Sequence, residues 1–301
     1  MIMPNFLIVG AAKTGTTSLY RYLKQHPQIY MSPAKEPKFF AYEGETLNFC
    51  GPDDSKEAKS VVTNIDAYQA LFDKVTDEIA IGEASTIYLY SSNAVKRIKH
   101  YIPHVKLITM LRNPIDRAYS NFLHLVYQGR EPLTDFAQAL EQEEQRILDN
   151  WWPFWHYKKR GLYYVQLKRY IDVFERDQIK VYIYEDFQNN LFSVLPDIFK
   201  FLEVNETFIP CLSERVRESR RAPKNKTLYA LFNKQNPIKS ILKPLFPDKL
   251  RQQITFTVNN GNLVKPKVSQ EVRKQLVEFY REDILQLQEL LQRDLSKWLE
   301  Y

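Results

Sequence analysis

The residues best suited to chemistry lie in a short loop near the start of the chain. Gly10-Ala-Ala-Lys-Thr-Gly-Thr-Thr-Ser18 follows the apolar run at residues 6–9 and precedes a segment of helical pattern. Small residues let backbone N–H groups curl around an anion, and the N-terminus of the next helix adds its positive dipole end. Lys13 supplies a full charge, and the hydroxyl groups after Gly15 can donate hydrogen bonds to phosphate oxygens. The loop therefore predicts a phosphate site.

The position of the lysine separates this loop from the loops of kinases and GTPases. A Walker A loop has its lysine directly after the second glycine. Here Thr16 follows Gly15, and Lys13 comes earlier. A kinase also needs a carboxylate for Mg²⁺, usually at the end of a neighbouring strand. The apolar run at residues 106–111 ends in Arg112 instead, so the pattern favours an anion site without a metal.

A second anion-binding segment starts at that arginine. It reads Arg112-Asn-Pro-Ile-Asp-Arg-Ala-Tyr-Ser120. The planar guanidinium of arginine can donate two hydrogen bonds to a phosphate, and Ser120, two turns into the expected helix, can add one. Asn-Pro is also a helix-start signal, with Pro114 at the first helical position. Alone, the segment therefore allows a structural or a functional role.

Both segments resemble the phosphate motifs of sulfotransferases that use 3′-phosphoadenosine-5′-phosphosulfate (PAPS). The similarity is greatest to the branch with the heparan sulfate sulfotransferases and many bacterial relatives, and it covers about residues 5–202. It implies that the first loop binds the 5′-phosphosulfate, while Arg112 and Ser120 hold the 3′-phosphate. The residues implied to bind the co-substrate in these motifs are Lys13, Thr14, Gly15, Thr16, Thr17, Ser18, Arg112 and Ser120.

The resemblance also implies two catalytic residues. The lysine matching Lys13 contacts the sulfate-bearing side of PAPS, where a cation stabilises charge growing on the leaving oxygen. Lys35-Glu-Pro-Lys-Phe-Phe40 resembles the segment with the catalytic glutamate, which makes Glu36 the expected base. A cation at Lys38 would favour its charged form. Two other bases stay open, namely Glu83 at a strand end and a histidine, of which His124 follows Ser120 by one turn.

Later segments extend the resemblance. Gly161-Leu-Tyr-Tyr164 is similar to a segment that helps bind the nucleotide, which implies that Tyr163 is a further co-substrate-binding residue. Tyr184-Glu-Asp186 matches a strand-end pattern of the family. Residues 215–251 contain eleven Lys or Arg and two acids. In related enzymes a basic loop from this region closes over the 3′-phosphate, which implies Arg221 and Lys224. The same charges also suit an anionic acceptor or a solvated surface.

Alternating apolar and helical segments predict an α/β fold with a parallel sheet, whose ligands bind beyond the carboxyl ends of the strands. The resemblance makes this a P-loop-like three-layer fold. We expect one domain over residues 1–301, with a core at about 5–202 and a basic, proline-interrupted segment and C-terminal helix at about 203–301. Expected strands cover residues 6–9, 79–83, 106–111 and 179–184. Expected helices cover residues 16–25, 115–128, 135–150, 162–174, 193–202 and 270–298.

Composition limits the alternatives. Two cysteines are too few for a disulfide framework or a metal cluster, and no segment has enough apolar residues to span a membrane. We expect a cytoplasmic, bacterial enzyme acting on a small-molecule or carbohydrate acceptor, without nucleic acid. The net charge is +6.

A P-loop kinase and a non-catalytic nucleotide- or anion-binding module are the competing functions. The aromatic cluster at residues 151–155 fits a core plug or an acceptor platform.

Overall fold

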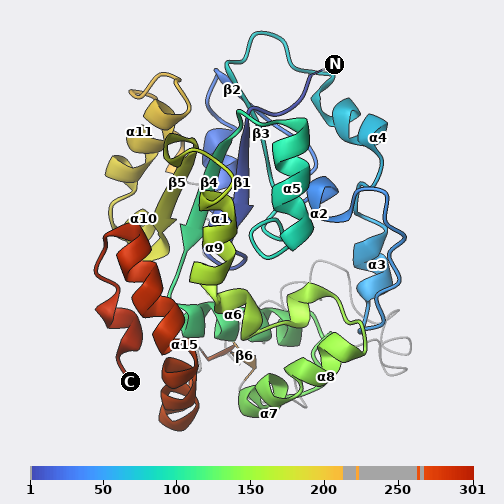
Figure 1. Cartoon of the computed structure of the whole chain (residues 1–301), viewed down its shortest axis with the longest axis vertical. Helices are drawn as coiled ribbons and strands as arrows, with labels where there is room; N and C mark the ends of the chain where they lie inside the picture. The colour runs from blue at the N-terminus through green and yellow to red at the C-terminus, as the bar shows by residue number, and fades with distance from the viewer. Residues whose placement is uncertain (1, 213–221, 224–262, 265–267) are drawn as a thin grey trace, which may run out of the picture.

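The computed structural model describes residues 2–212, 222–223, 263–264 and 268–301. A five-stranded sheet forms its centre (Figure 1), with strands in the order β2-β3-β1-β4-β5 and every pairing parallel. The expected α/β fold with a central parallel sheet is confirmed. The strands are β1 (Phe6–Gly10), β2 (Ile29–Met31), β3 (Ala80–Ala84), β4 (Lys106–Leu111) and β5 (Ile179–Ile183).

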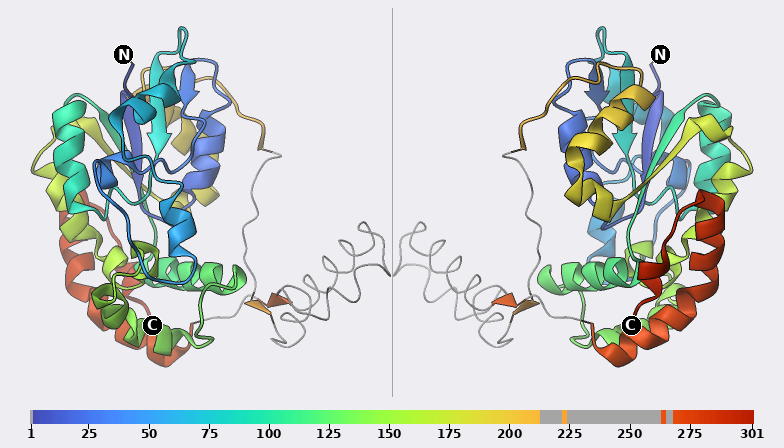
Figure 2. Two further views of the ribbon diagram at one scale, coloured as in Figure 1. Left: turned by 90° about the vertical axis from the view of Figure 1, so that its right-hand side faces the viewer. Right: turned by 90° about the vertical axis from the view of Figure 1, so that its left-hand side faces the viewer.

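Helices cover both faces of this sheet (Figure 2). In the first half of the chain they are α1 (Thr16–Leu23), α2 (Phe39–Tyr42), α3 (Asp54–Ala58), α4 (Ile65–Gln69), α5 (Ser92–Tyr101) and α6 (Pro114–Tyr127). The later helices are α7 (Phe136–Glu141), α8 (Glu143–Leu148), α9 (Tyr163–Ile171), α10 (Tyr184–Asn189), α11 (Leu191–Phe201) and α15 (Gln270–Leu291). Short 3₁₀ turns lie at Ala70–Phe72, Pro153–Trp155, Lys159–Gly161, Arg176–Gln178 and Ser296–Leu299. Two-residue strands β6 (Ala222–Pro223) and β7 (Leu263–Val264) pair antiparallel.

Strand alternation divides the buried side chains into two cores. In β1, Leu7 and Val9 join the core shared with α5, α6, α9 and α15, while Phe6 and Ile8 join the core shared with α1 and α11. All five residues of β1 are buried. A strand covered on both faces needs a continuous apolar run rather than an alternating one. The run at the start of the sequence therefore forms the middle of the sheet.

The C-terminal helix packs against the first of these cores. Leu276 and Tyr280 of α15 are buried with Leu7 of the sheet. The Tyr280 hydroxyl donates to the carbonyl of Lys158 at 2.9 Å, and the Asp283 carboxylate accepts from the backbone N–H of Tyr164 at 3.0 Å, at the start of α9. Of the helices that the structure describes, none combines the length and apolar character needed to cross a bilayer.

Several predicted boundaries are wrong. The helix expected at residues 135–150 consists of two short helices, α7 and α8, and the C-terminal helix ends at Leu291, where Gln292 adopts φ 51°. In α8, Leu148 is 78% exposed, whereas Glu143 and Arg146 are buried. The Arg146 guanidinium pairs with the buried carboxylate of Glu131 at 2.7 Å. The buried positions of α8 are thus occupied by charged side chains.

Candidate active site

The carboxyl ends of the parallel strands meet at one edge of the sheet, and a cleft of about 1290 Å³ opens there. The loop after β1 lines it with Lys13 and Gly15, followed by Thr16, Thr17 and Ser18 at the start of α1. Gly15 occupies the N-cap position, so no side chain caps the backbone N–H groups of this helix. These groups suit an anion, because the first N–H groups of a helix have no intrahelical acceptor.

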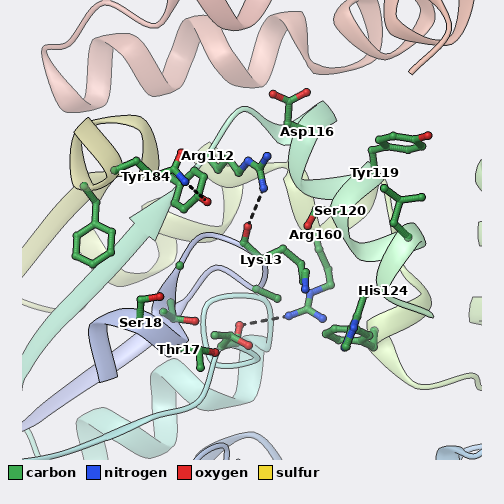
Figure 3. A pocket seen from close by; sticks show the side chains of 18 of the residues that line it. Lys13, Thr17, Ser18, Arg112, Asp116, Tyr119, Ser120, His124, Arg160 and Tyr184 are labelled. Carbon is green, nitrogen blue, oxygen red and sulfur yellow. Dashed lines mark hydrogen bonds between the residues drawn. The ribbon is translucent and has the colours of Figure 1, made fainter. Parts of the chain in front are cut away.

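Gly15 is required by both its backbone and its surroundings. Its φ is 87°, and a Cβ atom placed there would lie 3.0 Å from the ring of Tyr184, the first residue of α10. The same ring also lies against the second phosphate motif, with the Arg112 guanidinium 4.8 Å from its centroid (Figure 3). Tyr184 therefore contacts both predicted phosphate motifs.

Arg112 follows β4 and lines the cleft together with Ser120 of α6. One of its terminal nitrogens donates to the carbonyl of Lys13 at 3.3 Å, while its Nε is buried without a hydrogen-bond partner among the residues that the structure describes. The helix start is capped as the sequence predicts, because the Asn113 side chain accepts from the N–H of Ile115 at 2.9 Å. The Arg-Asn-Pro segment thus starts a helix and also brings a guanidinium into the cleft.

Glu36 lies in the cleft on a loop between β2 and α2. Its backbone N–H donates to the carbonyl of Ala84 at the end of β3, 2.9 Å away. Its carboxylate accepts from the N–H of Thr86 at 2.9 Å, from the Thr86 hydroxyl at 3.0 Å and from the Lys35 ammonium at 3.0 Å. Glu36, Lys38 and Lys13 all have positive φ, between 61° and 71°. Non-glycine residues rarely adopt this conformation, and such strain tends to gather at functional sites.

The charges around Glu36 favour its ionised form. Burial alone would raise the pKa of this carboxyl, but the neighbouring cations Lys35 and Lys38 and the Thr86 hydrogen bonds hold the pKa below its usual value. A carboxylate that keeps its charge at neutral pH and faces a cleft can accept a proton there. Its role as the base stays a prediction.

Glu83 has a different environment. It is fully buried and does not line the cleft. Its carboxyl accepts from the hydroxyls of Ser85 at 2.9 Å and Tyr68 at 3.3 Å. Burial raises the pKa of Glu83 to about 7, despite these hydrogen bonds. The Glu83 carboxyl therefore stays inside the protein at the end of β3. The carboxylate that lies in the cleft beside this strand end is that of Glu36.

Two buried cations also line the cleft beside Glu36, and sequence reasoning missed one of them. Arg160, 4% exposed, donates to the carbonyl of Thr86 at 3.4 Å and lies 5.5 Å from the ring of Phe154. Burial, followed by repulsion from Arg117, lowers the pKa of Arg160 to about 10, so the side chain stays charged at neutral pH. Lys38 lies 4.9 Å from the ring of Trp152. Arg160 directly precedes the Gly161–Tyr164 segment singled out from the sequence, but only the tertiary fold brings its guanidinium to Thr86.

The aromatic turn at residues 151–155 lies partly in the core and partly at the cleft, and its role as an acceptor platform stays a prediction. Trp155 is fully buried in the core, and Trp152 and Phe154 line the cleft. The buried Asp54 carboxylate fixes this wall, because it accepts from the Trp152 N–H at 2.7 Å and the Trp155 indole at 3.0 Å. It also pairs with Arg130 at 2.8 Å. The turn is therefore a rigid wall with one apolar face toward the cleft.

Some predicted site residues lie elsewhere. The Thr14 side chain is buried, and its hydroxyl donates to the carbonyl of Ala11 at 2.7 Å, so it shapes the loop from inside. Tyr163 is fully buried with its ring 6.2 Å from that of Trp298, and it does not line the cleft. Its expected contact with a nucleotide stays a prediction that this placement does not support. Arg221 and Lys224 lie outside the described residues, on either side of β6 in the sequence. His124 does line the cleft.

The described lining of the cleft is electropositive. It contains seven Lys or Arg side chains against three carboxylates, those of Glu36, Glu57 and Asp116. Arg160, Lys13, Arg112 and Ser120 surround the same space (Figure 3). Among the described residues, no group of three or more His, Cys, Asp or Glu side chains is arranged to hold a metal ion.

A parallel sheet with a glycine-containing loop between its central strand and the next helix is typical of a P-loop-like α/β protein. The model of the sulfotransferase family matches residues 4–207, and the chain belongs to this family. A crystal structure of a sulfotransferase from Alicyclobacillus acidocaldarius is similar over all of both chains, with 35% identity and a TM-score of 0.79.

Curated relatives support the same family. Mouse carbohydrate sulfotransferase 15 is 26% identical over 252 residues, which covers 67% of this chain and 44% of that protein. Mouse bifunctional heparan sulfate N-deacetylase/N-sulfotransferase 4 is 30% identical over 217 residues, which covers 67% of this chain and 22% of that protein. The chain thus matches less than half the length of these two relatives.

Proposed function

We propose that this protein transfers a sulfuryl group from PAPS to a hydroxyl or amine of an acceptor, without a metal ion. The observation that carries the proposal is the meeting of three separate segments in one cleft. The Lys13 loop, the Arg112 motif and the Glu36 carboxylate all line it. The first two suit the two phosphate groups of PAPS, and the third suits the acceptor's proton.

Each residue has a distinct role in this reaction. Glu36 accepts the proton of the acceptor as its oxygen or nitrogen forms a bond to sulfur. Lys13 and the N–H groups at the start of α1 stabilise the negative charge that grows on the 5′-phosphate oxygen as its bond to sulfur breaks. Arg112 and Ser120 hold the 3′-phosphate, and adenosine 3′,5′-bisphosphate leaves. Atoms and charge balance without a further reactant.

The acceptor side of the cleft suits a small molecule or a carbohydrate. Trp152 and Phe154 offer apolar ring faces, and Lys38 and Arg160 offer charged donors, all on the side of Glu36. Aromatic faces beside polar groups are a common arrangement in small-ligand sites. The relatives include a carbohydrate sulfotransferase and a heparan sulfate N-deacetylase/N-sulfotransferase, which favours the same class of acceptor. A cytoplasmic location and the absence of nucleic acid among its partners stay predictions.

The two competing functions lack a matching observation. A P-loop kinase would place a lysine after Gly15, where Thr16 stands, and a carboxylate at the end of β4, where Arg112 stands. A non-catalytic binding module would have no reason to hold an ionised, strained glutamate in the cleft. The backbone conformation and triple hydrogen bonding of Glu36 favour an enzyme.

The proposal is tested by assaying transfer from labelled PAPS to a panel of phenols, amino sugars and oligosaccharides. Glu36→Gln should leave PAPS affinity within about twofold and lower turnover by roughly 10²–10⁴. Lys13→Ala should lower kcat more than affinity, because its charge acts mainly in the transition state. Glu57→Gln is the matched control, since it removes the same charge from the same cleft. Near-normal turnover in Glu36→Gln, or equal losses in Glu57→Gln, would show that Glu36 is not the base.

A further inference from the structure

An ion pair from two distant parts of the chain lies at the edge of the cleft, beside the Arg112 motif. Arg273 of α15 donates to the Asp116 carboxylate of α6 at 2.8 Å, and both side chains line the cleft. Asp116 lies one helical turn before Ser120, so the two side chains share a face of α6. Figure 3 shows Asp116 close to Arg112 and Ser120, with the pale red helix passing along this edge.

The position of Arg273 is fixed by the packing of its helix. Ser269 caps the start of α15, where its hydroxyl accepts from the N–H of Val272 at 3.3 Å. The next turns bury Leu276 and Tyr280 against the sheet core. Arg273 thus projects from the first turn of a helix that is anchored along its inner face, and its side chain is 25% exposed.

The charge of Asp116 needs an explanation at this position. A carboxylate beside Arg112 and Ser120 would repel a phosphate bound there. Arg273 neutralises that carboxylate through one terminal nitrogen, and a guanidinium has five N–H donors in all. One of these donors bonds to Asp116, and the side chain stays 25% exposed at the cleft edge. The Arg273–Asp116 pair can therefore offer hydrogen-bond donors to a ligand without adding a net negative charge to the cleft.

We propose that Arg273 is a further ligand of the 3′-phosphate, and that Asp116 is a positioning residue that holds its guanidinium at the cleft edge. The inference rests on the proposed function, because it assigns the 3′-phosphate to the Arg112 side of the cleft. Arg273 lies beyond residues 4–207, which match the family model. The C-terminal helix thus contributes to the cleft a binding group that lies outside this matched region.

The test compares two ligands by calorimetry, adenosine 3′,5′-bisphosphate and adenosine 5′-phosphate. Arg273→Gln should weaken the bisphosphate about tenfold or more and the monophosphate less than twofold, since only the first has a 3′-phosphate. Arg273→Lys, which keeps the charge but loses the planar fork, should lie between. Asp116→Asn keeps an acceptor oxygen for Arg273 and removes the negative charge, so the bisphosphate should bind equally well or more tightly.

Arg281→Gln is the matched control, because it breaks an exposed ion pair with Glu278 on the same helix and does not line the cleft. It should change neither affinity. Two results would show that Arg273 is not a ligand and that the pair only joins two helices. In the first, Arg273→Gln leaves the affinity for the bisphosphate unchanged. In the second, Arg273→Gln and Asp116→Asn each weaken the bisphosphate and the monophosphate to the same extent. If the unmodified protein binds no bisphosphate at all, the proposed function itself fails, which is a separate result.

Discussion

At the scale of single residues, the site depends on side chains held by backbone groups of neighbouring strands. Thr86 is the clearest case, because its N–H and hydroxyl hold Glu36 while its carbonyl accepts from Arg160. One residue at the end of β3 therefore orients both the proposed base and a buried cation. Thr86 belongs to none of the motifs found in the sequence, and only the fold shows that it contacts Glu36 and Arg160.

Arg112 allows a direct test of the second phosphate site. Arg112→Ala should weaken adenosine 3′,5′-bisphosphate by about 1.5–3 kcal/mol, the range for a lost charged hydrogen bond. Adenosine 5′-phosphate, which lacks the 3′-phosphate, should lose much less and serves as the internal control. Titration calorimetry measures both. Equal weakening of the two ligands would mean that Arg112 does not contact the 3′-phosphate.

Glu83 predicts a pH dependence of stability. Its pKa of about 7 in the folded protein exceeds the ordinary value of 4.5 for an exposed glutamate. Between these pH values the folded state binds more protons than the unfolded state, so the free energy of unfolding falls as pH rises. This loss is absent below pH 4.5 and complete above pH 7. It amounts to at most about 3 kcal/mol.

The variant Glu83→Gln should remove this contribution. Urea unfolding at pH 5 and pH 8 should show the stability of the unmodified protein declining relative to the variant across that interval. The activity of Glu83→Gln with PAPS should fall far less than that of Glu36→Gln, because Glu83 does not reach the cleft. An identical pH dependence in both proteins would show that Glu83 is already ionised at pH 5.

The sequence predicted much of the site at this scale. The Lys13 loop, Glu36, Arg112 and Ser120 were found because contiguous motifs carry them, and the structure brings all of them to one cleft. Arg160 and Arg273 were missed, because neither belongs to a recognised motif and only tertiary packing brings them to the cleft. Thr14 was assigned with its loop, but its hydroxyl bonds to the carbonyl of Ala11 and turns inward.

At the scale of elements, long apolar runs were predicted well and short or polar elements were not. The strand Lys106–Leu111 has the bounds that its sequence indicates. The three-residue strand β2 is too short to show a period. The helix α5 was overlooked because only Ala94, Val95 and Ile98 of its ten residues are buried. A narrow apolar stripe on a polar helix gives little periodic signal.

The loop between β1 and α1 can be tested by a pair of matched glycine variants. Gly15→Ala forces an alanine into a positive φ and drives its Cβ against the Tyr184 ring. Gly44→Ala meets the same kind of φ, +69°, but nothing lies within 4 Å of its Cβ. Both should lose about 1–2 kcal/mol of stability from backbone strain.

Only Gly15→Ala should also affect ligand binding, because Tyr184 supports the Arg112 guanidinium. The bisphosphate should bind at least about tenfold more weakly to Gly15→Ala and equally well to Gly44→Ala. Thermal unfolding and calorimetry separate the two effects. Unchanged affinity in a folded Gly15→Ala protein would show that the loop tolerates a side chain and that Tyr184 is not a fixed link.

At the scale of the whole molecule, two cores on opposite faces of the sheet hold the strand ends that form the cleft. The helix α15 belongs to one of these cores and reaches the cleft edge through Arg273. The family motifs end well before this helix, so its contribution was predicted from the sequence only as an amphipathic segment. That residues 1–301 form one domain stays a prediction.

The most direct test of the account is calorimetric titration of the unmodified protein with adenosine 3′,5′-bisphosphate in the presence of EDTA. The proposed function assigns separate groups of the cleft to a 5′- and a 3′-phosphate, so we expect one site that binds the bisphosphate more tightly than adenosine 5′-phosphate or ATP. Removing metal ions should leave this affinity unchanged. A strict Mg²⁺ requirement, or tighter binding of ATP than of the bisphosphate, would contradict the sulfotransferase mechanism and favour a kinase.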